Sequence, residues 1–217
     1  MRILEYRDGM GLASDERERL SILFEEVGPD APTLCDGWQT RDLAAHLALR
    51  DRRPDAAGGI AVPALAARTQ RVQDEFAAKP WDELVDLVRT GPPRWSPFSL
   101  GALNDLVNGA EYFIHHEDVR RAVPGWEPRP SDGARDEQLW RTLRYVARRS
   151  YRRSVVGVLL RRPDGETIVG KRGPKAVTIS GEPGELLLHA FGRDECRVEF
   201  DGDEVAVTEI KGTKRSI

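Results

Sequence analysis

The sequence predicts an α+β protein with an N-terminal helical bundle and a small C-terminal α/β domain. Up to about residue 153, apolar residues recur with the period of a helix, between breaks at proline and glycine. Beyond that point the period shortens towards that of a strand, and Asp164–Gly165 and Asp201–Gly202 are typical hairpin turns. We therefore expect a bundle over residues 1–130, a connecting helix over 131–153 and an α/β domain over 154–217.

Four helical regions are expected before the connecting helix. Ser14 and Thr40 are suitable N-caps for the first two, and Gly28–Pro29 and Pro80 interrupt the helical pattern. Because the loops between these amphipathic segments are short, we expect them to pack as an up-and-down bundle. The expected helices, including one in the arginine-rich connecting segment, span residues 14–28, 40–53, 64–78 with 81–90, 99–122 and 134–152.

The C-terminal segment combines short strands with one helix. The helix, 185–191, follows Pro183–Gly184 and stops at Gly192. The expected strands, in which the apolar period is close to 2, span residues 155–160, 167–169, 176–179, 197–200 and 204–208.

The composition is that of a charged globular protein. Of 217 residues, 40% are hydrophobic and 32% charged, and the net charge of −3 argues against nucleic acid as the main partner. No apolar run approaches the roughly 18–20 residues of a membrane span, and Met1–Arg7 lacks the apolar core of a signal peptide. Cys35 and Cys196 form no CxxC pair, which indicates a reducing compartment. We therefore expect a cytoplasmic protein without a nucleic-acid or membrane partner.

One local exception to the charge balance is the segment Arg141–Arg162, which contains eight arginines. A solvated helix face with a basic edge explains this run. An anion pocket for an acidic substrate or a thiol cofactor explains it as well. The residues alone leave both interpretations open.

The rest of the chain is organised around the segment Ala110–Val119 (AEYFIHHEDV). Glu111 and His115 are four residues apart, so on a helix both side chains leave the same face, one turn apart. His46, on another expected helix, could supply a third ligand. Two nitrogens and one oxygen, with a fourth position open, are the ligand count of a catalytic zinc site. The alternative is an ordinary surface pair of polar residues.

A polar stripe extends on both sides of this pair, formed by Asn104, Asn108, Glu111, His115 and Asp118. Burying such a stripe is costly unless each group has a partner. Asn108 is therefore expected either to orient a ligand or to pack between helices. The neighbouring His116 lies about 100° round the helix, and we expect it to support a ligand or to face solvent.

Three further residues have more ordinary interpretations. Cys35 is expected to be a small buried residue rather than a nucleophile, and Trp38 a core anchor rather than a substrate wall. His189, which lies among leucines and an alanine, is expected to be a core or interface histidine.

Residues 35–47 (CDGWQTRDLAAHL) and 111–115 (EYFIH) resemble the DinB-like metal-binding bundle of the mycothiol-dependent maleylpyruvate isomerase family. The resemblance implies a four-helix bundle in which His46, Glu111 and His115 bind zinc or another divalent ion. It also implies a thiol cofactor, such as mycothiol.

A looser match, over Glu185–Leu188 and Gly192–Arg193, extends the resemblance to the C-terminal domain. The arginines of 141–162, together with Lys171, Arg172 and Arg193, supply cations for the anionic body of a thiol. We expect Arg193 to bind the thiol cofactor, because a guanidinium fork pairs with a carboxylate at two points.

These observations predict a thiol-dependent isomerase or S-transferase that acts on a small electrophile. Bound zinc would lower the pKa of a thiol at the fourth position and supply a thiolate at neutral pH. The alternative is a non-catalytic metal-dependent binding or stress-response protein with the same three ligands. A phosphohydrolase of the HD type is disfavoured, because Glu117 separates His116 from Asp118 and that chemistry needs histidine and aspartate adjacent.

Overall fold

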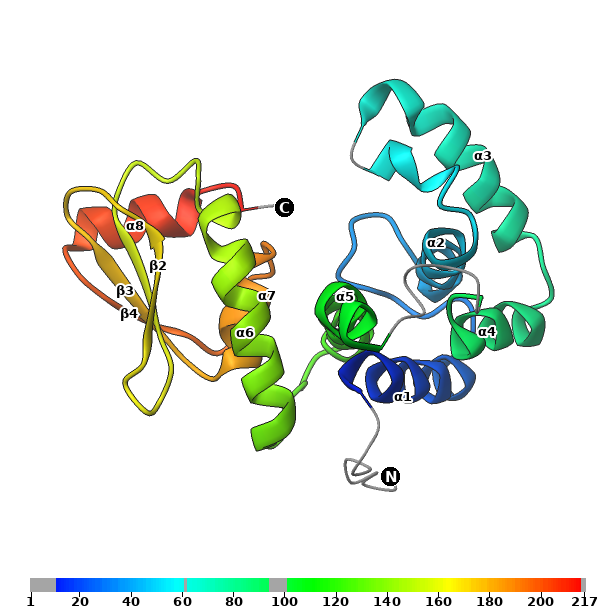
Figure 1. The fold of residues 1–217 in the computed structure, drawn as a ribbon, viewed down its shortest axis with the longest axis horizontal. Coiled ribbons are helices and arrows are strands. Elements are labelled where there is room, and N and C mark those ends of the chain that lie inside the picture. The colour runs from blue at the N-terminus through cyan, green and yellow to red at the C-terminus, as the bar shows by residue number, and fades with distance from the viewer. Residues whose placement is uncertain (1–10, 61, 94–100, 216–217) are drawn as a thin grey trace. The chain divides into compact units, whose positions relative to one another are not determined.

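The structure of the protein is a computed structural model that describes residues 11–60, 62–93 and 101–215 (Figure 1). Its helices and a four-stranded sheet confirm the predicted α+β class. The chain divides into two compact units, Met1–Trp126 and Glu127–Ile217. Within the described ranges, no helix is long and apolar enough to cross a membrane. The expectation for Met1–Arg7 lies outside the described residues.

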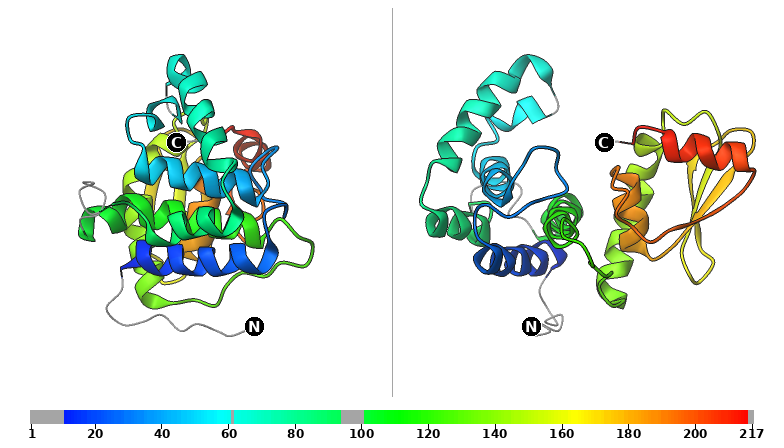
Figure 2. Two further views of the ribbon diagram at one scale, coloured as in Figure 1. Left: turned by 90° about the vertical axis from the view of Figure 1, so that its right-hand side faces the viewer. Right: turned by 180° about the vertical axis from the view of Figure 1, so that it is seen from behind.

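The first unit is helical. Its bounds are α1 Leu12–Val27, α2 Thr40–Arg52, α3 Ala66–Ala77, α4 Trp81–Thr90 and α5 Gly101–Arg120, with short 3-10 helices at Ala57–Ile60 and Pro63–Leu65. α1 packs against α4 and α5, and α2 packs against α3 and α4. Figure 1 views α2 and α5 nearly end-on, and the left view of Figure 2 shows α1, α2 and α5 from the side with their axes nearly aligned.

The ends of α1 and α2 follow from capping, although not always by the predicted residue. α1 begins earlier than expected, with Gly11 rather than Ser14 as its N-cap. α2 begins at the expected Thr40, but Gln39 is its N-cap and takes part in a capping box. The Thr40 hydroxyl instead donates to the Gly28 carbonyl at 2.6 Å, which ties the end of α1 to the start of α2.

The apolar faces of these helices form one core. Phe24 on α1 contacts Trp81 on α4 edge to face, with ring centroids 5.6 Å apart. Because both α2 and α5 contribute to this core, any polar side chain between them is held on rigid elements. The fully buried members of the core include Leu20, Phe24, Leu43, Ala44, Leu84, Val88 and Tyr112.

The second unit combines helices with a mixed sheet. Its elements are α6 Gly133–Ser150, β1 Val158–Arg161, β2 Thr167–Lys171, β3 Val177–Ser180, α7 Pro183–Ala190, β4 Glu199–Asp201 and α8 Glu204–Gly212. The strand order is β2-β1-β3-β4; β1 pairs antiparallel with β2 and parallel with β3, and β4 pairs antiparallel with β3. The helix expected over 131–153 is α6, which packs against α7 and β2.

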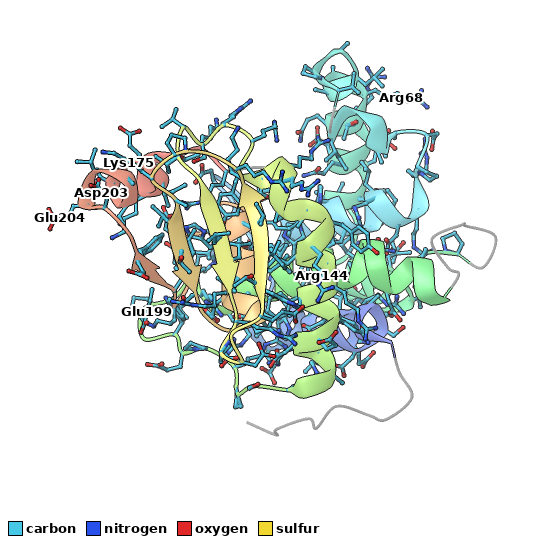
Figure 3. All side chains as sticks on the ribbon, turned by 60° about the vertical axis from the view of Figure 1, so that its left-hand side comes forward. Arg68, Arg144, Lys175, Glu199, Asp203 and Glu204 are labelled. Atoms are coloured by element: carbon cyan, nitrogen blue, oxygen red, sulfur yellow. The ribbon has the colours of Figure 1, made fainter. Side chains whose placement is uncertain are left out.

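The strand predicted over 204–208 is wrong, because this segment is the helix α8. The Asp203 carboxylate accepts hydrogen bonds from the backbone N–H groups of Val205 and Ala206, so Asp203 is an N-cap. Ala206 and Ile210, four residues apart, are its buried residues. Figure 3 labels Asp203 and Glu204 at the start of this helix. The short apolar run of this segment therefore did not distinguish a strand from a helix.

His189 on α7 lies in the interior of the second unit, as predicted for a core histidine. Its Nδ1 is 2.7 Å from the Tyr151 hydroxyl, and the two rings stack with centroids 5.9 Å apart. The His189 ring also meets Phe200 edge to face. Burial, followed by the positive charge of Arg215, lowers the pKa of His189 to about 3. The imidazole is therefore neutral at physiological pH.

This low pKa predicts a loss of stability in acid. A histidine that titrates near 6.5 when unfolded takes up a proton in the unfolded chain first, so stability is lost as the pH falls from about 6.5 towards 3. Between about pH 7 and pH 4, His189 alone is expected to cost the folded state roughly 3 kcal/mol. Urea unfolding of the wild type and of His189→Asn at both pH values measures this loss in the free energy of unfolding. A wild type and a variant with the same pH dependence would contradict it.

Candidate functional site

His46 on α2 and Glu111 and His115 on α5 converge within the first unit. His46 Nε2 lies 3.6 Å from Glu111 Oε1, and His115 Nε2 lies 3.3 Å from the same oxygen. The two imidazole rings are 5.6 Å apart between centroids and nearly perpendicular. The three side chains thus present two imidazole nitrogens and one carboxylate oxygen to one another.

This donor set fits a divalent ion. Each residue offers one ligand atom, and the three atoms lie within 4.8 Å of one another. For bonds of about 2.0–2.1 Å, the ligands of a tetrahedral zinc lie roughly 3.3 Å apart. The separations from Glu111 Oε1 to the two histidine nitrogens are close to that value. Three protein ligands leave a fourth position for another group, as in catalytic rather than structural zinc sites.

The other face of His115 is fixed by Asp118, one turn along α5. His115 Nδ1 lies 2.9 Å from Asp118 Oδ2, and this carboxylate is fully buried. A carboxylate that accepts from Nδ1 leaves the lone pair of Nε2 free to bind a metal. Asp118 therefore orients His115 towards the position shared with His46 and Glu111.

Cys35, in the loop before α2, approaches the same carboxylate. Its thiol donates to Asp118 Oδ2 at 3.3 Å, and its sulfur lies 3.9 Å from His115 Nδ1. Cys35, His115 and Asp118 also form a group with metal-ligand spacing. The two groups use opposite nitrogens of His115, so they are distinguishable by whether sulfur is a ligand.

The ionisation of the three side chains reflects their burial and their contacts. Burial lowers the pKa of His46 despite its contact with Glu111. Burial tends to raise the pKa of Glu111, but Arg50, His115 and His46 together hold it well below its usual range. Burial opposes the charge of His115, whereas hydrogen bonds with Asp118, Cys35 and Glu111 raise its pKa well above the usual value. An ion at this centre therefore displaces a proton from His115.

The rim of the centre contains Trp38 and Arg50. The Trp38 ring lies 5.1 Å from that of His46 between centroids, so the predicted core anchor also packs against a candidate ligand. Arg50 follows His46 by one turn of α2, and its Nε lies 3.6 Å from Glu111 Oε1. Its Nη1 donates to Asn108 Oδ1 at 2.7 Å, so Asn108 bridges the two helices. Asn104 lies outside the described side chains.

His116 points away from this centre. Its Nδ1 lies 2.9 Å from Glu16 Oε2 on α1, and both side chains are buried. The prediction that it supports a ligand or faces solvent is therefore wrong: His116 joins α5 to α1. This contact gives the imidazole and one carboxylate oxygen a buried polar partner.

Several cations of the second unit have carboxylate partners. Arg141 and Arg162 contact Glu137, and Arg144, which Figure 3 labels on α6, contacts Glu166. These arginines form a solvated, ion-paired face, the first of the two interpretations of the arginine run. The guanidinium of Arg193, the expected thiol-binding residue, donates through Nη1 to the Phe191 carbonyl at 2.9 Å.

Another part of the arginine run borders a hollow of about 370 Å³ on the second unit. Its lining consists of Arg148, Arg152, Val169, Gly170, Lys171 and Arg172. Four of these lining residues are cations, so this hollow is the part of the second unit that best fits the anion-pocket interpretation.

Replacing Asp118 with asparagine is expected to weaken zinc binding by about 10- to 100-fold, because His115 loses the charged acceptor that orients it. Dialysis against zinc buffers, followed by metal analysis, measures the change. The matched control is Asp42→Asn on α2, whose carboxylate caps the helix and faces solvent. Equal affinities for Asp118→Asn and the wild type would show that Asp118 does not position His115.

No protein-family model matches the chain, and no curated protein matches it either. Two solved structures are similar to it: the mycothiol-dependent maleylpyruvate isomerase and a mutant of that enzyme. Each aligns with a TM-score of 0.60 over 88% of this chain and 90% of the other, at 18% sequence identity. The resemblance expected from residues 35–47 and 111–115 is thus confirmed as a shared fold.

Proposed function

We propose that the protein is a metal-dependent enzyme that uses a small thiol to isomerise, or to transfer sulfur to, a small electrophile. The observation that carries this proposal is the convergence of His46, Glu111 and His115 on one point, with distances that suit a divalent ion. The similarity to a mycothiol-dependent isomerase supports the choice of a thiol. On this proposal the helices α1, α2, α4 and α5 form a four-helix bundle of the DinB-like kind.

Each residue of the centre has a distinct task. His46, Glu111 and His115 would hold the ion, preferably zinc because the donors are imidazole and carboxylate. A zinc ion there supplies the charge that lowers the pKa of a thiol at the remaining position. Asp118 fixes the tautomer of His115, and Trp38 packs against His46 and limits its rotation.

The second unit is proposed to supply cations for the body of the thiol. Arg193 is the residue we expect to pair with an anionic or hydroxyl group of the cofactor, for which mycothiol is the first candidate. Its loss is expected to weaken thiol binding by roughly 1.5–3 kcal/mol while leaving the zinc content unchanged. Calorimetric titration of zinc-loaded Arg193→Ala and of Arg141→Ala, a cation already paired with Glu137, separates a specific effect from a general loss of charge.

Titration of zinc-loaded and metal-free protein with mycothiol and other small thiols tests the proposed function. Binding that requires zinc, followed by thiol-dependent turnover of an electrophile such as maleylpyruvate, is the expected result. Zinc binding without any thiol binding at millimolar concentration would instead favour a non-catalytic metal-dependent protein with the same ligands. Thiol binding that is equally tight without zinc would contradict the role of the metal.

A further inference from the structure

Arg50 is the cation nearest to the proposed metal ligands, and the function proposed above leaves it without a task. It lies one turn after His46 on α2, and its side chain is 19% exposed. Its Nε faces Glu111 Oε1 at 3.6 Å, and its Nη1 donates to Asn108 Oδ1 at 2.7 Å. These two contacts fix the plane of the guanidinium beside the centre.

The contacts of Arg50 use only part of its hydrogen-bonding capacity. A guanidinium has five N–H donors in a rigid fork. Among the described residues, Nε of Arg50 faces Glu111 and Nη1 donates to Asn108, whereas Nη2 has no partner. The edge formed by Nη1 and Nη2 can therefore still donate two hydrogen bonds to an anion.

The charge at the centre favours an anion at this edge. A divalent ion held by one carboxylate and two neutral imidazoles keeps an excess of positive charge. Arg50 adds to that positive charge, because it contacts Glu111, which is also a proposed ligand of the ion. The Arg50 guanidinium and a metal ion compete for the same oxygen of Glu111, so Arg50 by itself weakens metal binding. A bound anion would offset this effect.

A purely structural role for Arg50 is the simpler alternative. Arg50 joins α2 to α5 through Asn108 and Glu111, and such a bridge could serve the bundle alone. That role predicts that removing Arg50 loosens Glu111 and weakens metal binding. A role in ligand binding predicts the opposite sign, because removing a neighbouring cation makes the site more attractive to a divalent ion.

We propose that Arg50 binds a carboxylate group of the electrophilic substrate beside the open position of the metal centre. This inference rests on the proposed function and extends it, because it restricts the substrates to small electrophiles that carry a carboxylate. Arg50 is the specificity-determining residue for that group, and Asn108 is the positioning residue that holds its guanidinium in plane.

Acetate binding to protein loaded with cobalt in place of zinc tests the assignment, with the visible absorption of cobalt as the readout. Acetamide, which has the same shape and no charge, serves as the control ligand. The variants are Arg50→Gln, Arg50→Lys and Arg52→Gln. Arg52 is matched to Arg50 because it is also on α2, but it contacts Thr90 rather than the centre. Metal affinity is measured for each variant before acetate is added.

Arg50→Gln is expected to bind acetate at least about 10-fold more weakly, with a metal affinity that is equal to or higher than that of the wild type. Arg50→Lys should recover part of the affinity, since it keeps the charge but loses the fork. Arg52→Gln should match the wild type. Equal acetate binding in Arg50→Gln and wild type, or a loss of metal affinity in Arg50→Gln, would overturn the inference alone. A wild type that binds no metal would overturn the proposed function, and this inference with it.

Discussion

Replacing Glu111 with alanine is expected to lower the affinity of the protein for zinc by more than about 100-fold. Glu111 supplies the oxygen that both histidines approach, at 3.6 Å from His46 and 3.3 Å from His115. Loss of a residue that merely orients a ligand already costs about 10- to 100-fold, so loss of a ligand should cost more. The wild type should carry about one zinc per chain, and Glu111→Ala and His46→Ala should lose most of it.

His116→Ala is the matched control for these variants. His116 is also a buried histidine of α5, but it pairs with Glu16 on α1 rather than with the centre. Its removal should lower stability, because the buried Glu16 carboxylate loses its contact with the imidazole, yet the zinc content should remain. Zinc loss in His116→Ala equal to that in Glu111→Ala would mean that the wrong histidine had been assigned. Circular dichroism of each variant verifies that it is folded.

Glu117→Gln is expected to destabilise the protein by roughly 3–5 kcal/mol, the largest effect on stability that we predict. Glu117 is fully buried and accepts hydrogen bonds from Arg120 at 2.8 Å and from Arg121 at 2.5 Å. Arg121 is itself buried and lies over the Trp126 ring, 4.5 Å from its centroid. Removing the carboxylate charge takes away a buried counter-charge of the Arg121 guanidinium.

The control for this variant is Glu83→Gln on α4. Glu83 pairs with Lys79 at the surface of the same unit, and its side chain is 50% exposed, so the expected loss is less than about 1 kcal/mol. Urea unfolding measures both variants. Losses of similar size would show that the Glu117 pair stabilises the protein no more than a surface ion pair does. A double Glu117→Met, Arg121→Met variant should recover much of the stability.

Sequence reasoning located the three candidate ligands because helical geometry determines which residues share a face. The i, i+4 spacing of Glu111 and His115 fixes their relation locally, and the apolar stripes of α2 and α5 require those helices to pack in one core. His46 was a candidate because it lies on another amphipathic helix of the expected bundle, and the family resemblance supported its position opposite the pair. Asp118 belonged to the predicted polar stripe, and its spacing of three from His115 was the available signal for its contact.

The contacts that sequence reasoning missed depend on tertiary packing. Cys35 lies in a loop, and nothing in its neighbours along the chain predicts the hydrogen bond to Asp118. Arg50 shares a face with His46, but charged residues one turn apart are common on exposed helices. The prediction for His116 failed because periodicity gives the direction of a side chain but not its tertiary partner. That partner is Glu16 on α1.

The strand predicted over 204–208 shows the same limit in the second unit. The segment Glu204–Thr208 (EVAVT) is a short apolar run between two polar residues, which is too short to separate a strand from a helix. The capping carboxylate of Asp203, together with burial of Ala206 and Ile210 on one face, makes it the start of α8. The available signal was an aspartate followed by an acidic first turn, which favours a helix.

X-ray absorption at the zinc edge of protein loaded with one zinc per chain, without added thiol, tests the central claim most directly. Binding by His46, Glu111 and His115 predicts a first shell of nitrogen and oxygen atoms at about 2.0–2.1 Å, with imidazole scattering and no sulfur. A sulfur atom at about 2.3 Å that disappears in Cys35→Ser would contradict the account. It would place the ion instead between Cys35, Asp118 and the Nδ1 side of His115.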